Sequence, residues 1–159
     1  DTPRRVAQAA LDIFSGIHGD PAAALGGGEP IEGVYPGPVA VRDIPYSSIC
    51  EHHLLPFQGT VSVTYLPDRR LAGIGDFDTM IRVLAARPQM QERLADQIAA
   101  VTESTLGAKG VLVRLTAEHA CMWARGERTV GATAFSVASR GVYTVESPER
   151  VEARALLGL

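Results

Sequence analysis

Residues 50–57 read Cys50-Glu51-His52-His53-Leu54-Leu55-Pro56-Phe57. A thiol, a carboxylate and two imidazoles therefore occupy four consecutive positions. Cys50 and His53 are three residues apart, so a single turn of chain can direct both side chains at one metal ion. Cysteine sulfur and histidine nitrogen are common zinc ligands. We interpret this segment as half of a metal site.

A second candidate half-site lies downstream at His119-Ala120-Cys121. The chain has two cysteines and four histidines, and both cysteines and three of the histidines fall in these two clusters. Cysteines flanked by histidines indicate a metal or catalytic site better than they indicate a disulfide framework. We expect the fold to bring the two clusters together.

Three ligands, from Cys50, His53 and Cys121, would leave a fourth zinc position open for water, which is typical of a catalytic site. Zinc lowers the pKa of its bound water toward neutrality and so generates a nucleophile. The two neighbouring imidazoles, on His52 and His119, can act as general acid and base. A structural site with His119 as a fourth ligand is the alternative.

Composition bounds the class of protein. A chain of 159 residues is long enough for one domain with a real core, and we expect residues 1–159 to form a single domain. The net charge of −3 gives no basic field for nucleic acid or an anionic membrane. No apolar run approaches the roughly 20 residues of a membrane span, and no signal-peptide pattern opens the chain. We expect a cytoplasmic protein.

Hydrophobic periodicity and turn residues predict an alternation of helices and strands. In chain order the expected elements are a helix over 3–17, a Gly- and Pro-rich loop over 19–38, strands over 39–44 and 60–65, helices over 76–86 and 88–106, a strand over 111–119, a strand or hairpin over 129–145 interrupted at Gly141, and a helix after Ser147. This order predicts an α+β fold, with an antiparallel sheet and helices packed on one face. Unprotected sheet edges would favour an oligomer.

Three longer motifs carry a resemblance to a known family. They are Cys50-Glu51-His52-His53-Leu54-Leu55-Pro56-Phe57, Gln89-Met90-Gln91-Glu92-Arg93-Leu94 and Glu118-His119-Ala120-Cys121-Met122. Together they resemble GTP cyclohydrolase I, and the similarity runs in order from Thr2 to Gly141. The resemblance implies the tunnelling fold, in which helices pack on antiparallel β-hairpins. It also implies homo-oligomeric rings, commonly decamers, with sites at the subunit interfaces.

The resemblance also implies a chemistry. Family members hold Zn²⁺ on the positions matching Cys50, His53 and Cys121, and a zinc hydroxide attacks C8 of the guanine ring. The positions matching His52 and His119 move protons. The imidazole ring of the purine opens, formate leaves, and the ribose is rearranged to build a dihydropterin.

Substrate-binding residues are implied in the same way. The carboxylate matching Glu92 anchors the guanine edge, helped by Gln91, because a carboxylate can accept two N–H bonds from such an edge. Arg125, Arg140 and Arg5 match arginines of the family pattern. These five residues are the expected contacts with a small purine-type substrate.

One segment departs from the family pattern. Members typically carry a Ser, a Lys and an Arg that handle the ribose and triphosphate, and here Gly75, Asp76 and Thr79 stand at these positions. Two cations are lost and an anion is gained, which turns attraction for a triphosphate into repulsion.

Several functions stay open at this point. The first is a zinc-dependent cyclohydrolase that converts GTP to 7,8-dihydroneopterin triphosphate and formate, or that opens a related unphosphorylated guanine-like heterocycle. The alternative class is a non-catalytic relative that binds a pterin or purine and regulates or scaffolds a partner. A reductase of the same fold, which would form an adduct with a nitrile through a cysteine, is disfavoured because no cysteine lies outside the two clusters.

Overall fold

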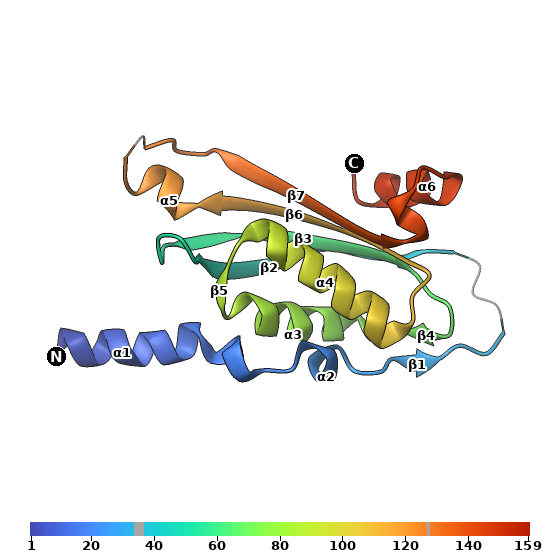
Figure 1. Cartoon of the computed structure of the whole chain (residues 1–159), viewed down its shortest axis with the longest axis horizontal. Helices are drawn as coiled ribbons and strands as arrows, with labels where there is room; N and C mark the ends of the chain where they lie inside the picture. Colours follow the sequence, from blue (N-terminus) through green and yellow to red (C-terminus); the bar gives the residue numbers. More distant parts are fainter. Residues whose placement is uncertain (34–36, 127) are drawn as a thin grey trace.

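The computed structural model describes residues 1–33, 37–126 and 128–159. The elements shown in Figure 1 are α1 (Thr2–Ile13), η1 (Ser15–His18), α2 (Pro21–Leu25), β1 (Glu29–Pro30), β2 (Val39–Cys50), β3 (Pro56–Leu66), β4 (Arg70–Leu71), α3 (Ile74–Ala85), β5 (Pro88–Gln89), α4 (Gln91–Leu106), β6 (Gly110–His119), α5 (Ala120–Trp123), β7 (Thr133–Gly141), η2 (Val142–Thr144) and α6 (Pro148–Leu156). The α+β class expected from the sequence is confirmed.

The main sheet has the strand order β5-β2-β3-β6-β7. The β2–β3, β3–β6 and β6–β7 pairs are antiparallel, whereas β5 runs parallel to β2. The sheet is therefore mixed, and the expectation of a purely antiparallel sheet was wrong at this edge. The expected helix over 88–106 begins only at Gln91. Its first residues are extended because Gln89 pairs with Cys50 of β2 and its carbonyl oxygen accepts the Glu51 N–H at 3.0 Å.

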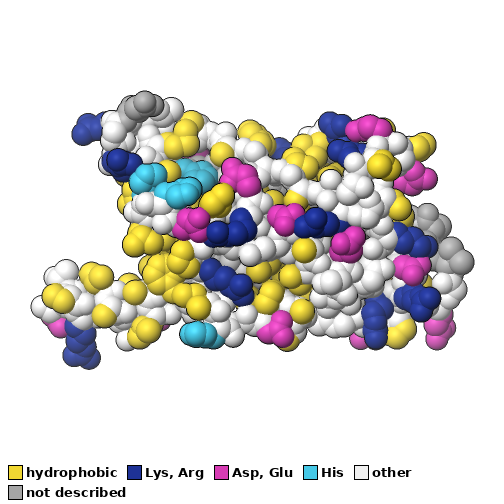
Figure 2. Space-filling model, in the orientation of Figure 1, with side chains coloured by type: hydrophobic (Ala, Val, Ile, Leu, Met, Phe, Trp, Pro, Cys, Tyr) yellow, Lys and Arg dark blue, Asp and Glu magenta, His cyan; other side chains and the backbone are white. Residues whose placement is uncertain are grey.

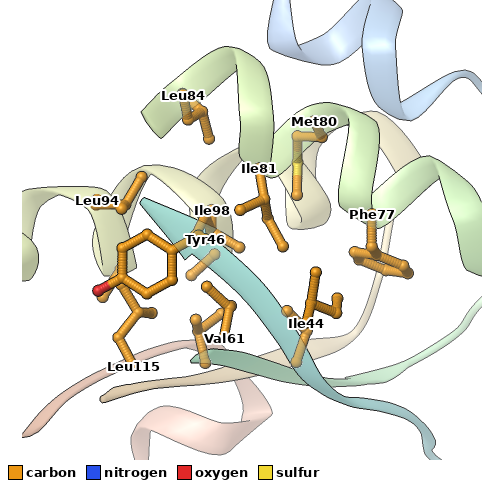
Figure 3. Close-up of a cluster of buried hydrophobic side chains, with 14 of the residues drawn as sticks. Ile44, Tyr46, Val61, Phe77, Met80, Ile81, Leu84, Leu94, Ile98 and Leu115 are labelled. Atoms are coloured by element: carbon orange, nitrogen blue, oxygen red, sulfur yellow. The ribbon is translucent and has the colours of Figure 1, made fainter. Parts of the chain in front are cut away.

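Helices α3 and α4 cover one face of the sheet and enclose the main core (Figure 1). Leu94 and Ile98 are one turn apart on α4, and neither is exposed to solvent. They pack with Val61 and Leu115 of the sheet and with Ile81 of α3 (Figure 3). Gly107 ends α4 in the left-handed conformation (φ 62°), as its position after the last helical residue predicted.

A second, smaller core lies on the opposite face of the sheet. It consists of Leu112, Tyr143, Ala153 and Leu157, and it places α6 across the sheet from α3 and α4 (Figure 1). The expectation that helices pack on one face only was therefore wrong. The chain reverses at Gly141, whose φ of 57° is accessible to glycine and at which a Cβ atom would lie 2.1 Å from the Lys109 carbonyl oxygen.

The N-terminal segment contains more and shorter elements than the sequence predicted. The helix expected over 3–17 ends at Ile13 and is followed by η1. No residue of α1 is buried, and Figure 1 shows this helix projecting from the body of the molecule. The expected loop over 19–38 contains α2 and the short strand β1, while its residues 34–36 lie outside the described part of the chain. No helix within the described residues is long and apolar enough to cross a bilayer.

Candidate metal centre

A tight turn between β2 and β3 carries the first cluster. The Leu54 N–H donates to the Cys50 carbonyl oxygen at 2.8 Å, and the Cys50 N–H donates to the Leu55 carbonyl oxygen at 2.9 Å. Leu54 has a φ of 52°, which reverses the chain within this turn. Cys50 is buried at the end of β2, whereas His52 and His53 are exposed on the turn. Figure 2 shows histidine side chains gathered at this end of the molecule, next to arginine and carboxylate side chains.

Strand pairing brings the second cluster to the first. Phe57 of β3 faces His119 of β6 in the antiparallel register, so the chain that follows β6 enters α5 beside the β2–β3 turn. The sulfur atoms of Cys50 and Cys121 and a ring nitrogen of His53 all lie within 4.8 Å of one another. The sequence-based expectation that the two clusters meet is confirmed.

The three ligand atoms fit a zinc ion. In a tetrahedral site with the usual zinc–sulfur and zinc–nitrogen bonds, ligand atoms lie about 3.5–3.8 Å apart. The Cys50 Sγ to His53 Nδ1 distance is 3.9 Å. Burial, and then the neighbouring Cys50 thiol, raise the pKa of Cys121. Two thiols held this close do not both ionise readily, and a divalent cation between them would remove that cost.

His119 is the more enclosed of the two candidate proton-transfer residues. Its imidazole stacks on the Phe57 ring, with 4.7 Å between centroids and 3° between planes. Its Nε2 atom lies 2.7 Å from the Gln91 side-chain oxygen. Burial lowers the pKa of His119, and the Glu92 carboxylate opposes this shift. Burial therefore favours the neutral form of this imidazole.

His52 lies on the solvent side of the cluster. Its side chain is 62% exposed, and its Nδ1 atom lies 4.0 Å from the Cys50 sulfur. This distance is close to that of His53, but the group of ligand atoms that converge contains His53 and not His52. The group that could hold a metal ion thus includes His53 and leaves out His52.

Hydrogen bonds from Arg93 connect the turn to neighbouring residues. The Arg93 guanidinium donates to the Glu51 carboxylate, to the Gln89 side-chain oxygen at 3.0 Å and to the Pro88 carbonyl oxygen at 3.1 Å. The hydrogen bond from Arg93 lowers the pKa of Glu51. Sequence reasoning did not assign roles to Glu51, Gln89 or Arg93, although all three stand inside the quoted motifs. Their contacts tie the Cys50–His53 turn to the start of α4.

The expected substrate-binding residues are not all near the cluster. Gln91 is buried and bonded to His119, whereas Glu92 is exposed one residue further along α4. The charge of the Glu92 carboxylate raises the pKa of His119, against the effect of burial. Arg125 lines a cavity of about 330 Å³ together with Cys121.

The two other expected arginines each pair with an aspartate. Arg140 pairs with Asp96 at 2.5 Å. It lies seven residue pairs from the Glu118–Thr133 end of the β6–β7 ladder, about 23 Å at the usual strand rise. Arg5 projects from α1, 4.0 Å from Asp1, with a side chain that is 83% exposed.

The segment that departs from the family pattern opens α3. Figure 1 shows that α3 begins beside β4, away from the turn that carries Cys50. Asp76 accepts a hydrogen bond from the Gly73 N–H at 3.2 Å and so caps the helix, while Gly75 and Thr79 are exposed. A single chain does not bring Gly75, Asp76 and Thr79 to its own metal cluster.

Known proteins share sequence similarity with almost the whole of this chain. The profile of the GTP cyclohydrolase I family matches residues 1–158. A GTP cyclohydrolase 1 of Leifsonia xyli subsp. xyli is 48% identical over 157 residues, which cover 99% of this chain and 82% of that protein. A GTP cyclohydrolase 1 of Dehalococcoides mccartyi is 41% identical over 159 residues, which cover 99% of this chain and 83% of that protein.

Among solved structures, the archaeosine synthase QueF-Like in its apo form is similar, with a TM-score of 0.54 and 21% identity over 68% of this chain and 97% of that chain. At this identity the likeness concerns the fold alone, and it supports the tunnelling fold. The match over residues 1–158 and the 48% identity go further. This chain belongs to the GTP cyclohydrolase I family.

Proposed function

We propose that this protein is a zinc-dependent cyclohydrolase that opens the five-membered ring of a guanine-type purine and releases formate. The observation that carries the proposal is the convergence of Cys50, His53 and Cys121 within 4.8 Å, with His119 two residues before Cys121 in the chain. Membership of the GTP cyclohydrolase I family supports a hydrolase. The zinc ion, the substrate and the residue roles are our proposal.

The chain supplies proton-transfer groups on two sides of the cluster. Zinc held by Cys50, His53 and Cys121 would supply Lewis acidity and a bound water that ionises near neutral pH. Burial lowers the pKa of His119 and so favours the neutral imidazole, which can accept a proton. His52 is exposed and can exchange protons with solvent. The pair therefore offers a half-buried group and a solvent-exposed group for proton transfer.

Substrate orientation is assigned to Glu92. Its carboxylate lies close enough to His119 to oppose the fall in the pKa of that imidazole. A carboxylate here can accept two N–H bonds from the guanine edge, which would turn the purine ring toward the metal ligands. Arg125 shares a cavity with Cys121 and is the arginine of this chain placed to meet an anionic group.

We further propose that the sites are completed by other copies of the chain in a ring, decamer-like oligomer. Arg140 and the start of α3 are too far from the cluster of their own chain to serve it, and Arg5 lies on α1, which projects from the body of the molecule. Helix α1 presents exposed apolar side chains, including Val6 and Leu11, at 62% and 70% exposure. A largely apolar groove of about 1000 Å³ lies between η1, β2 and α3. Figure 2 shows hydrophobic side chains where the N-terminal helix meets the body.

Two substrate classes fit the chemistry. The family favours GTP, which would yield 7,8-dihydroneopterin triphosphate. Asp76 favours an unphosphorylated guanine-like heterocycle, because its carboxylate stands where a cation would attract a triphosphate. Parallel assays of the zinc-loaded protein with GTP, guanosine and guanine separate these cases. Pterin fluorescence from GTP supports the first, and formate from guanosine or guanine alone supports the second.

The second candidate function is a non-catalytic pterin- or purine-binding protein. Its supporting observation is the altered segment Gly75, Asp76 and Thr79. Binding of a purine by zinc-loaded protein, without formate release from any of the three substrates, would favour this candidate and overturn our proposal. A cytoplasmic location and a single domain over residues 1–159 also remain predictions.

A further inference from the structure

The buried amide of Gln91 has a partner at each end. Gln91 is the first residue of α4 and is 2% exposed. Its Nε2 atom donates to the Ala134 carbonyl oxygen at 3.2 Å and lies 3.5 Å from the Leu115 carbonyl oxygen. Its Oε1 atom lies 2.7 Å from the His119 Nε2 atom. The side chain thus bridges strands β6 and β7 and the imidazole.

These contacts fix which way the amide points. Reversing it would set an oxygen against two carbonyl oxygens, which are acceptors only. The amide nitrogen therefore faces Ala134 and Leu115, and the amide oxygen faces His119. An oxygen without hydrogen can only accept, so His119 must carry its proton on Nε2. In a neutral imidazole this leaves Nδ1 as the acceptor nitrogen.

The imidazole is also held in place. The Phe57 ring lies parallel to it, and Phe57 is itself 1% exposed. A stacked ring restricts tilting, and the bond to Gln91 restricts rotation about the stacking axis. Together these two contacts define one tautomer and one orientation for His119.

We propose that Gln91 is a positioning residue, which holds His119 in one orientation and in the Nε2–H tautomer, so that Nδ1 is the acceptor nitrogen of the ring. This inference rests on the proposed function, since it assumes that His119 transfers a proton. It replaces the substrate contact that the resemblance implies for Gln91. The exposed carboxylate of Glu92 is then the purine-binding group of this pair.

Substitution Gln91→Met retains the length of the side chain and removes both hydrogen-bonding ends. We expect kcat to fall by roughly 10- to 100-fold, as for other groups that orient a catalytic histidine. KM for the purine should stay close to that of the unaltered protein, because the Gln91 side chain is buried and both ends of its amide have partners within the protein. In a His119→Ala background, Gln91→Met should cause no further loss of kcat.

Thr102→Val is the matched control. Thr102 is buried on the same helix, and its hydroxyl donates to the Ile98 carbonyl oxygen at 2.8 Å. The substitution removes one buried hydrogen bond from α4 without approaching His119. It should lower stability modestly and leave kcat and KM unchanged.

The direct test is nitrogen NMR of protein labelled with ¹⁵N-histidine, with and without zinc, in which the His119 signals are assigned by their loss in His119→Ala. We expect a protonated Nε2 and an unprotonated Nδ1 in the unaltered protein and in Thr102→Val, and a mixture of tautomers in Gln91→Met. A proton on Nδ1 in the unaltered protein overturns the inference without any variant. A raised KM with an unchanged kcat and tautomer in Gln91→Met also overturns it.

The outcomes separate this inference from the proposed function. The protein could turn over none of the purines and still show an Nε2–H tautomer that depends on Gln91. That result would support the contact between Gln91 and His119 but would leave it without a role in catalysis. It would therefore overturn the proposed function and the role of His119 in proton transfer together. Turnover with a tautomer that does not depend on Gln91 overturns the positioning role alone.

Discussion

The imidazole of His119 lies parallel to the ring of Phe57, with 4.7 Å between the ring centroids and 3° between the planes. The contact follows from strand register, because these two residues face each other across the β3–β6 pair. It joins the metal centre to the core, since Phe57 is part of the main hydrophobic cluster. The Phe57 side chain therefore belongs to the hydrophobic core and also contacts a candidate proton-transfer residue.

Replacing Phe57 with Leu should affect both properties. The loss of ring volume and of the stacked contact is expected to lower the free energy of unfolding by about 1–2 kcal/mol. Activity should fall as well, because His119 loses one of the contacts that hold its orientation. Phe77→Leu is the control, since Phe77 is equally buried in the main core but its ring lies against Tyr65, tilted by 45°. Urea unfolding and turnover assays should show equal destabilisation and a loss of activity for Phe57→Leu only.

The metal ligands predict a clear change in metal content. Cys121→Ser replaces a thiolate by a much weaker zinc ligand, so purified protein should hold far less than the one zinc per chain expected without the substitution. His18→Asn is the control, because His18 is the histidine outside the two clusters. Elemental analysis after dialysis gives the result. Equal zinc in both variants would contradict the assignment of Cys121.

Arg93 should influence the metal without touching it. Arg93→Met removes the contacts to Glu51, Gln89 and Pro88 that hold the turn of Cys50 and His53. We expect roughly 10- to 100-fold weaker zinc binding, as for other groups that orient ligands. Stability should change little, because the Arg93 side chain is 40% exposed.

The control for Arg93 is Arg82→Met. Arg82 pairs with Asp78 at 2.8 Å on the exposed side of α3, away from the turn. Competition with a chelator of known affinity measures zinc binding in both variants. Similar affinities for Arg93→Met and Arg82→Met would show that the network does not support the turn.

We expect the buried side chain of Tyr143 to make the stability of the protein depend on pH above about pH 10. Burial, followed by the charges of Glu152 and Glu149, raises the pKa of Tyr143 to about 12. An unfolded tyrosine ionises near pH 10, so between these values the folded state binds more protons than the unfolded state. Stability from this group is fully present below pH 10 and is lost as the pH rises toward 12.

Tyr143→Phe should remove this dependence. The Tyr143 hydroxyl is buried with no hydrogen-bond partner in the described part of the chain, so the substitution should leave stability at pH 7 unchanged or raise it by up to about 1 kcal/mol. Tyr65→Phe is the matched comparison, because the Tyr65 hydroxyl accepts the Ala72 N–H at 3.0 Å. It should cost about 1 kcal/mol. Urea unfolding from pH 7 to 11 distinguishes the two.

The group of three candidate metal ligands could be predicted from the sequence, because the ability to bind a metal belongs to the residue type itself. Cys50, His53 and Cys121 are few, reactive and correctly spaced. The contact of Gln91 could not be predicted, because it depends on the Ala134 carbonyl of a strand that begins more than forty residues further along the chain. That contact arises only when β7 packs beside β6.

The errors in the fold have a similar cause. Pro88 is common at a helix start, but here the paired edge of β2 holds Pro88 and Gln89 in a strand. A helix after Ser147 was predicted, but capping residues do not say which face of a sheet such a helix covers. In the structure, α6 packs against Leu112, which points to the face of the sheet opposite α3 and α4.

The most direct test of the central claim is formate release from a guanine-type substrate by three preparations: zinc-loaded protein, the same protein after chelation, and Cys121→Ser. We expect steady release from the first, loss of release after chelation with recovery on adding zinc, and no recovery for Cys121→Ser. Formate release that persists without metal, or that Cys121→Ser supports equally well, would contradict a zinc-dependent cyclohydrolase built on Cys50, His53 and Cys121.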